Sequence, residues 1–387
     1  MLVLLYEWLK GWLNAHGMGW TRVVADPTFR SMLCLPVAFL IMLVVAPRFI
    51  RWLVRQKIGD NPNFDQPDIN DLMAMKKNTP TMGGVLIIAA IVGTVLLLGD
   101  LRSFYVRMAL LVTVYLGALG AIDDWLKLTK HRRGATDRQG LRSIEKLLFQ
   151  IGLGVLIGYF TYRHGEPFVQ NVTLYVPFFK NASIVLGAVA FVTIATLVLT
   201  GTSNAVNLTD GLDGLAAGCM AIVSFTFFIL ATIIGTTVEL KDRPLAEGLF
   251  LPHIEGSVEM AVVAAALCGA CIGFLWFNCF PAKVFMGDTG SLAIGGLLGY
   301  IAIVVRQEVL LFLVGGVFVA EAVSVMMQVS YFKLTRKMTG TGRRIFLMSP
   351  LHHHFQKKGW PEPRVVVRFW MITAMLAAMA LATVKLR

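Results

Sequence analysis

Charged residues are scarce in this sequence: Asp, Glu, Lys and Arg together make up 15% of its 387 residues. Soluble domains carry about 25% of charged residues, and so few charges could not cover a surface that faces water. Hydrophobic residues make up 56% of the chain, and the mean hydropathy is +0.69. These values exclude a disordered chain and indicate an integral membrane protein.

Cysteines and acidic residues are also few. The five cysteines are an odd number and most lie inside apolar segments, so we interpret them as small core residues and not as a disulfide framework. The 23 acidic residues leave a formal net charge of +12. The basic residues lie between apolar runs instead of clustering as they do in nucleic-acid-binding domains, so we expect no nucleic acid among the partners.

The apolar runs predict an all-α polytopic membrane protein with ten transmembrane helices, because each run is about 20 residues long. No repeat or Pro/Ser-rich linker divides the sequence, so we take residues 1–387 as one integral membrane domain. The predicted spans are 32–53, 80–99, 104–126, 145–162, 182–200, 213–235, 258–280, 289–305, 309–332 and 364–385.

The basic residues also predict the orientation of the chain. The odd-numbered loops between the spans carry 23 of the 35 Lys and Arg residues, which predicts that these loops are cytoplasmic and that both termini are periplasmic. Alternating polar and apolar residues from Phe168 to Phe179 predict a short periplasmic β-hairpin. The cytoplasmic loops, in which we expect the active site, are 54–79, 127–144, 201–212, 281–288 and 333–363.

Two adjacent carboxylates, Asp123 and Asp124, end the third predicted span. A charged side chain near the bilayer centre costs about 2.5–3.5 kcal/mol, so this pair must face water, a cation or a substrate. Acidic groups oppose the dipole at the C-terminus of a helix, which favours a compensating cation or Lys127 nearby. A solvated helix end is the alternative interpretation.

Four amide and carboxylate side chains recur at intervals of three residues, which places them on one side of a helix. They are Asn204, Asn207, Asp210 and Asp213. Gly211 and Gly214 favour a partly unwound turn in the same segment. Side chains rich in oxygen, with no Lys or Arg among them, suit a hard cation or a sugar, although the spacing does not match an EF-hand. A merely polar loop is the alternative.

A third polar cluster extends from Asn278 to Ser291 and includes Phe285. Within it Gly287 and Gly290 flank Asp288, just before a predicted span. Glycines at this place would let backbone amides approach an anion at the N-terminus of the helix. An N-terminal cap formed by Asp288 explains the same pattern equally well.

Three consecutive histidines, His352–His354, lie in the last predicted cytoplasmic loop. Zinc sites favour spaced ligands, so we interpret the histidines as phosphate or sugar contacts. The segment Lys76–Gly84 adds ammonium and hydroxyl groups at the cytoplasmic mouth of the second span. It does not match the Walker P-loop pattern.

These acids, lysines and histidines meet one face of the predicted membrane domain. Carboxylates that bind Mg²⁺ and lysines that bind phosphate oxygens are the groups that phosphoryl transfer requires. A transporter without chemistry is the alternative, but it would place its polar groups near the membrane midplane. Only Glu321, with Gln328 further along the same span, is of that kind.

The motifs together resemble those of the polyprenyl-phosphate N-acetylhexosamine 1-phosphate transferases. Within that superfamily the resemblance is strongest to the phospho-N-acetylmuramoyl-pentapeptide transferases, and it extends from Lys76 to the C-terminus. The segments that carry it are Thr79–Gly84, Asp123–Lys127, Asn204–Gly214, Phe285–Gly290, His352–His354 and Gly359–Arg364.

The resemblance implies a Mg²⁺-dependent enzyme that transfers phospho-MurNAc-pentapeptide from UDP-MurNAc-pentapeptide to undecaprenyl phosphate. Its products are lipid I and UMP, so it would serve peptidoglycan synthesis, and with it cell shape and division. It also implies ten spans in the bacterial cytoplasmic (inner) membrane, with the active site on the cytoplasmic face. A relative that uses a different sugar is the alternative, and a homodimer is one assembly open to such a protein.

The resemblance further implies roles for single residues. Asp288 is implied as the magnesium ligand, and Asp123, Asp124 and Asp288 as the catalytic residues, with Asp123 preferred as the base. The implied substrate-binding residues are Lys76, Thr81, Lys127, Asn207, Asp210, Asp213, Asn278, Phe285, Gly287, Gln328, His352, His353 and His354.

Two mechanisms stay open at this point. The acceptor phosphate attacks the donor directly, or an Asp attacks first and forms a phospho-enzyme intermediate. We favour direct attack, because a phosphate monoester is already a competent nucleophile. The segment 333–346 is several residues longer than the family pattern.

Overall fold

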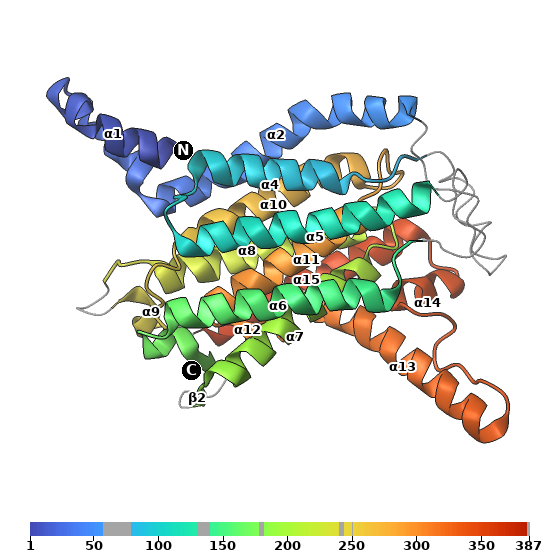
Figure 1. The fold of residues 1–387 in the computed structure, drawn as a ribbon. Coiled ribbons are helices and arrows are strands. Elements are labelled where there is room, and N and C mark those ends of the chain that lie inside the picture. Colours follow the sequence, from blue (N-terminus) through green and yellow to red (C-terminus); the bar gives the residue numbers. More distant parts are fainter. Residues whose placement is uncertain (57–78, 130–139, 178–181, 240–243, 250, 385–387) are drawn as a thin grey trace.

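The computed structural model describes residues 1–56, 79–129, 140–177, 182–239, 244–249 and 251–384. Figure 1 shows a bundle of long helices with both chain termini at one end. The first half contains α1 (Leu2–Ala15), η1 (Gly19–Ala25), α2 (Pro27–Arg55), α4 (Gly84–Leu98), α5 (Phe104–Leu128), α6 (Ser143–Gly165), η4 (Val169–Val172), β1 (Thr173–Tyr175) and β2 (Ser183–Val185). The second half contains α7 (Ala188–Thr209), α8 (Leu215–Gly235), α9 (Leu245–Gly248), α10 (Glu259–Asn278), α11 (Gly287–Val304), α12 (Glu308–Val314), α13 (Gly316–Thr339), α14 (Leu351–Lys357) and α15 (Glu362–Thr383).

Nine helices in the described part of the chain are long and apolar enough to cross a membrane. They show a multi-pass membrane protein. The segment predicted as the second span forms α4, which is apolar but only 15 residues long. Each of the ten predicted spans therefore coincides with a helix, while ten crossings and the periplasmic location of the termini remain predictions.

We call the end of the bundle at which α2, α5 and α13 finish the basic end, because these helices end in basic residues. Arg55, Lys127, Arg336 and Lys337 all lie in the last turns of these helices. Both termini lie at the opposite end (Figure 1). This agrees with the expectation that the two termini share one side of the membrane.

Two boundaries differ from the prediction. The fifth span was predicted to end at residue 200, but α7 continues to Thr209, so most of the predicted loop 201–212 is helical. Apolar residues become fewer after Leu199, but the polar residues Asn204 and Thr209 still belong to the helix. The helix ends only where the segment with Gly211 and Gly214 begins. The ninth span is broken at Gly315 into α12 and α13, and α13 extends well into the predicted loop 333–363.

The predicted β-hairpin is present, but its position was partly wrong. β1 pairs antiparallel with β2, and Leu174 is opposite Ile184. The first part of the predicted region forms the 3-10 helix η4, and β2 lies in residues assigned to the next span. A strand of three residues cannot be separated from an adjoining apolar helix by its hydrophobic pattern.

The core of the bundle is formed by α10 and α11, which are buried along most of their length. Small residues allow neighbouring helices to approach them closely. A Cβ atom on Gly299 would lie only 2.3 Å from Thr202 Oγ1 of α7, so the two backbones touch there. Close contacts of this kind hold α7 against α11, whose first turn carries Asp288.

Candidate active site

Two carboxylates and two lysines meet at the basic end of the bundle. Asp123 ends α5, Asp288 begins α11, and Lys146 lies in the first turns of α6. Asp123 Oδ2 lies 2.7 Å from Lys127 Nζ and 2.8 Å from Lys146 Nζ. Asp288 Oδ2 lies 3.3 Å and 2.6 Å from the same two ammonium groups. Each lysine therefore bridges both carboxylates.

The exposure of these four groups differs. The Asp123 side chain is fully buried, and its Oδ1 accepts a further hydrogen bond of 2.7 Å from the Leu141 amide. The Asp288 side chain is 14% exposed and that of Lys127 is 44% exposed. The cluster is thus sealed on the Asp123 side and open on the side of Asp288 and Lys127, where a ligand from solution can reach it.

Asp124 has a different role from its neighbour, because both of its oxygens are bound by α11. Its carboxylate accepts hydrogen bonds from the amides of Asp288 (3.1 Å) and Thr289 (3.0 Å) and from the Thr289 hydroxyl (2.6 Å). Asp124 therefore caps the N-terminus of α11, where a negative charge is stabilised by the helix dipole.

This capping decides between the two interpretations of the Gly287–Gly290 segment. The anion that approaches these amides is the carboxylate of Asp124, which the sequence pattern did not identify. Asp288 is no cap, since its side chain points to the lysines. Gly287 has a φ of +71°, and a Cβ atom there would lie 2.6 Å from Asp124 Oδ2, so the close approach requires glycine.

A short backbone pairing fixes the start of α11 from the other side. The amides of Gly83 and Gly84 donate to the carbonyls of Phe285 and Met286, each at 2.8 Å, and the Phe285 amide donates to Pro80. Gly84 packs directly on Gly290, where a Cβ atom would lie 2.0 Å from the Gly290 nitrogen. The predicted site residues Thr81 and Phe285 are thereby brought next to Asp288, while Lys76 lies outside the described residues.

The three aspartates fit a divalent cation. Asp123, Asp124 and Asp288 each offer an oxygen within 4.8 Å of the others, and carboxylate oxygens are the ligands that Mg²⁺ prefers. Asp124 is engaged by α11, and Asp123 by the Leu141 amide and both lysines, so the partly exposed Asp288 is best placed to turn to an ion, with Asp123 beside it. Three carboxylates against two ammonium groups leave one negative charge, which a cation would balance.

The predicted polar turn at residues 204–213 is partly a helix end and partly a loop, as its glycines indicated. Asn204 and Asn207 lie on α7, and Asp210 follows its last residue. Asp213 Oδ2 accepts from the Ala282 amide at 3.0 Å, and the Asp213 amide donates to Glu362 Oε1 at 2.7 Å. Asp213 thus connects the turn to the loop before α11 and to α15.

Asn278 contributes to the same connection. Its Oδ1 accepts from the Gly214 amide at 3.0 Å, and its Nδ2 donates to the Val284 carbonyl at 2.9 Å. Its side chain is almost completely buried. In this structure Asn278 therefore holds two loops together, and its predicted contact with a substrate stays a prediction.

The histidines adopt three different environments. His352 is completely buried: Gly211 lies against its Nε2, and its Nδ1 is 3.3 Å from Glu321 Oε2. Its backbone amide also donates to Glu321 Oε1 at 3.1 Å. His353 Nδ1 lies 2.8 Å from Gln356, and His354 Nδ1 accepts from the Leu347 amide. The three imidazoles thus have different partners, and their predicted contacts with phosphate or sugar stay a prediction.

Gln328 connects α13 to the loop that follows it. Its Oε1 accepts from the amides of Ile345 and Phe346, each at 3.0 Å. With both side-chain atoms engaged by this loop, Gln328 supports the chain before α14. Its predicted contact with substrate is untested.

Two important residues were not identified from the sequence. Lys146 was counted only as a loop charge, although a cation in the first turns of a helix is unfavourable and indicates a nearby acid. Glu321 was noted without a partner, which proves to be His352. Both residues could have been found by the same signal: an ionisable side chain at a position where its charge is unfavourable without a partner of opposite charge.

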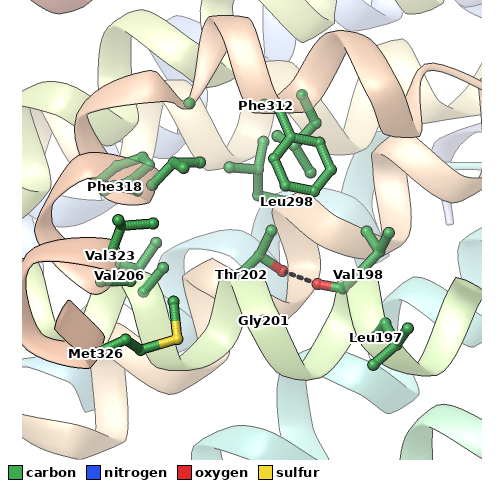
Figure 2. Close-up of a pocket in the computed structure, with 15 residues that line it drawn as sticks. Leu197, Val198, Gly201, Thr202, Val206, Leu298, Phe312, Phe318, Val323 and Met326 are labelled. Carbon is green, nitrogen blue, oxygen red and sulfur yellow. Dashed lines mark hydrogen bonds between the residues drawn. The ribbon is translucent and has the colours of Figure 1, made fainter. Parts of the chain in front are cut away.

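An apolar groove runs along the outside of the bundle between α7 and α13. Figure 2 shows Leu197, Thr202 and Val206 of α7 facing Phe318 and Met326 of α13 across it. The enclosed volume is about 190 Å³, and Phe312 lies at one end. Its only hydroxyl, that of Thr202, donates to the Val198 carbonyl at 2.7 Å, so the walls offer contacts to hydrocarbon alone.

The fold and this cluster define a multi-pass membrane protein with a buried carboxylate–lysine site. Residues 106–306 match the model of glycosyl transferase family 4, and residues 76–88 match signature 1 of the phospho-N-acetylmuramoyl-pentapeptide-transferases. A phospho-N-acetylmuramoyl-pentapeptide-transferase from Desulfotalea psychrophila (strain LSv54 / DSM 12343) is 46% identical over 360 residues, which are 93% of this chain and 94% of that protein. The chain therefore belongs to the phospho-N-acetylmuramoyl-pentapeptide-transferases, membrane-bound transferases of peptidoglycan synthesis.

Proposed function

We propose that the chain transfers phospho-MurNAc-pentapeptide from UDP-MurNAc-pentapeptide to undecaprenyl phosphate, giving lipid I and UMP. The observation that carries this proposal is the meeting of Asp123 and Asp288 with Lys127 and Lys146. Such a cluster combines groups that bind a metal ion with groups that bind phosphate. The name of the relative supports the identity of the transferred group.

In the proposed reaction, an oxygen of the acceptor phosphate attacks the sugar-bearing phosphorus of the donor. The bond between this phosphorus and the oxygen shared with UMP breaks, and its electron pair leaves with UMP. Lys127 and Lys146 bind phosphate oxygens and thereby reduce the repulsion between two anionic reactants. Asp123 accepts the proton when the acceptor arrives as a monoanion.

Asp288 is the proposed magnesium ligand, with Asp123 as its neighbour. When bound there, Mg²⁺ would neutralise charge on the pyrophosphate of the donor. Asp124 positions Asp288 by capping α11 and needs no contact with substrate to do so. This assignment changes the implied role of Asp124 from a catalytic residue to a positioning residue.

The donor side of the proposed site comprises the end of α7, the turn that follows it and α14. Asn207 and Asp210 are its candidate contacts to the nucleotide and sugar, together with Thr81, Phe285 and His353. The buried residues Asp213, Asn278 and His352 hold these segments against each other. We expect substitution of these three residues to weaken donor use, because the segments that carry the candidate donor contacts would shift.

The groove between α7 and α13 is the proposed location for a segment of the polyprenyl chain. Its apolar walls suit an isoprenoid, and one wall includes Leu298 of α11, the helix whose first turn carries Asp288. An acceptor bound there would have its chain on the membrane side and its phosphate toward the basic end. Phe318→Trp, which narrows the groove, is expected to raise the KM for the lipid and not for the nucleotide.

The decisive experiment measures UMP release by the purified chain in detergent micelles. We expect release only when both substrates and Mg²⁺ are present, and its loss upon chelation of the metal. Exchange of labelled UMP into the donor without any acceptor would instead indicate the phospho-enzyme mechanism. Absence of UMP release with both substrates and Mg²⁺ present, together with transport of the donor by the chain in sealed vesicles, would overturn the proposed function.

The orientation can be tested by labelling. UDP-sugars are cytoplasmic, so the basic end must face the cytoplasm if the donor is correctly assigned. Single cysteines at Gln356 and Glu239, in a background without the native cysteines, should then react from opposite faces of sealed vesicles. Reaction of Gln356→Cys from the outer face would exclude both the orientation and the donor.

A further inference from the structure

The C-terminal part of α13 and the loop after it project from the bundle. Figure 1 shows α13 running obliquely to the other long helices, so that its last turns lie apart from them. We call residues 331–347 the basic tip. None of its residues is buried, so it contributes nothing to the core. The types of its residues therefore indicate whether it contacts water, lipid or another molecule.

The basic tip has charge of one sign only. The sequence contains no acidic residue between Glu321 and Glu362. Among the residues that the structure describes, no ion pair involves any of the five cations of the tip. These cations are Lys333, Arg336, Lys337, Arg343 and Arg344, and all are exposed.

Large apolar side chains form a stripe along one face of the same helix. Met327, Tyr331, Leu334 and Met338 follow each other at intervals of four, three and four residues, which places them on one side. Their exposed fractions are 46%, 38%, 55% and 74%. Ile345 and Leu347 in the following loop are also exposed. Surface of this kind is costly in water.

The cations and the stripe occupy different faces of α13. By the 100° rotation per residue of an α-helix, Lys333 and Arg336 fall on the sides away from Leu334 and Met338, and Lys337 lies beside the stripe. Val323 of the spanning part lies one turn before Met327 on the same side and is also exposed, so the stripe continues the outer surface of that part. A soluble partner would not need an apolar surface continuous with the hydrocarbon. This pattern is typical of a helix that lies at a membrane interface.

We propose that the basic tip lies in the headgroup layer at the basic end and binds anionic phospholipids of that leaflet. The stripe would enter the acyl region while the five cations contact lipid phosphates. The tip is connected to the histidines, because Gln328 holds the amides of Ile345 and Phe346 and the Leu347 amide donates to His354. Lipid binding would therefore fix the chain that leads into α14.

The test measures which lipids surround the tip and needs no catalytic turnover. The full chain, with the exposed Cys279 changed to Ser, carries a fluorophore on Met338→Cys and is placed in phosphatidylcholine nanodiscs with a minor fraction of phosphatidylglycerol. Bromine atoms on one lipid or the other quench the label. We expect phosphatidylglycerol near the tip at roughly fivefold its bulk fraction, the equivalent of about 1 kcal/mol for one engaged cation, and less at high salt.

Two sets of substitutions localise the effect. Changing all five cations of the tip to Gln should reduce quenching by phosphatidylglycerol to its bulk share, with an unchanged thermal melt. Changing Arg48, Arg51 and Arg55 to Gln removes exposed cations at the basic end of α2, and should leave the enrichment at the tip unaltered.

Three results would overturn the proposal. They are an absence of enrichment around the unaltered tip, enrichment that survives neutralisation, and a label that no brominated lipid quenches. The third result would place the tip in water and favour an acidic soluble partner. None of these measurements depends on whether the chain releases UMP, so the lipid surface and the proposed activity can fail separately.

Discussion

Charged side chains are buried at both ends of the helix bundle, but the two groups differ in balance and access. At the end opposite the basic end, Arg30 of α2 pairs with Glu259 of α10 at 2.5 Å, and both side chains are at most 8% exposed. Arg306 and Glu308 form a second pair at 2.7 Å, at most 3% exposed. At the basic end, Asp123 and Asp288 share two lysines, Asp124 lies beside them as a third carboxylate, and Asp288 and Lys127 are partly exposed.

The difference distinguishes buried charges that stabilise the fold from charges that can bind a ligand. Each pair at the opposite end has one charge of each sign and also binds backbone: Arg30 donates to the Leu98 carbonyl, and Glu259 accepts from the Asp100 amide. The first pair ties α2 to α10, while Arg306 of the second pair donates to the Thr173 carbonyl of β1. Both pairs are buried and offer nothing to a ligand. The cluster at the basic end has surplus negative charge, shared contacts and an open side, which are the properties that a metal ion and a phosphate need.

The largest effect is expected at the open cluster. Asp288→Asn should lower turnover about 1,000-fold or more, because an amide is a poorer magnesium ligand than a carboxylate. The thermal melt should change little, since Asp288 is partly exposed and Asp123 keeps both lysines paired. Turnover by the purified variant in micelles is compared with the melt. Near-normal turnover would remove Asp288 from the proposed chemistry.

The neighbouring carboxylate gives a sharper version of the same test. If Asp123 takes a proton from the acceptor phosphate, Asp123→Asn should lower kcat more than it weakens donor binding. The second pKa of a phosphate monoester is about 6, so the defect should shrink as the pH rises and the acceptor loses its proton unaided. A defect independent of pH would indicate that Asp123 acts by position or charge alone.

The reverse pattern is expected for the paired charges. Glu259→Gln should destabilise the protein by about 3 kcal/mol, because it leaves the Arg30 guanidinium buried without its counter-charge. Activity per folded molecule should be preserved. Replacing both partners, as in Arg30→Met with Glu259→Leu, should restore much of the stability. A large loss of activity in a fully folded Glu259→Gln protein would break the comparison.

An intermediate effect is expected for Glu321, which is buried like the structural pairs but contacts the histidine segment. Glu321→Gln should weaken donor use about tenfold, because it loosens His352 and the start of α14. Ser324→Ala, one turn further on α13, serves as the control. If Glu321 acts through His352, its effect should vanish in a His352→Ala background, and additive losses would contradict this role.

The smallest effect concerns Asp100, at the opposite end. Partial burial alone would raise the pKa of this carboxyl, but hydrogen bonds and charge from Arg102 hold the pKa below its ordinary value. The stabilisation it gives is therefore present above the ordinary carboxyl pKa and is lost as the pH falls through the lowered one. Asp100→Asn should lower the Tm by about 2 °C or less at neutral pH and by nothing in strong acid. An equal loss at both pH values would refute the electrostatic explanation.

Much of the fold could be predicted from the sequence because a bilayer imposes length and polarity on each span. All predicted spans coincide with helices, and errors occur where polar residues continue a helix, as after Leu199 in α7, or where a span breaks, as at Gly315. Both are decided by tertiary contacts. Gly299 packs on Thr202 of α7, for example, and no local pattern reveals that.

The site could be predicted by residue type but not by role. Asp123 and Asp124 are adjacent and chemically identical in sequence, yet one meets two lysines and the other caps α11. This distinction depends on the direction in which each side chain points from the end of α5. The sequence does not show that Asp288 and Lys146 lie close to Asp123. Convergence of α5, α6 and α11 had to be seen in the structure.

The backbone pairing between residues 80–84 and 285–286 has a consequence for biogenesis. The amides of Gly83 and Gly84 find their partners only at Phe285 and Met286, so these groups wait until most of the chain has left the ribosome. Until then Asp123 and Asp124 lack the α11 amides and Asp288 that complete their surroundings. A nascent chain halted before α11 therefore lacks one of the two carboxylates that share Lys127 and Lys146. Insertion of α11 completes this cluster, and the later helices α14 and α15 then complete the donor side.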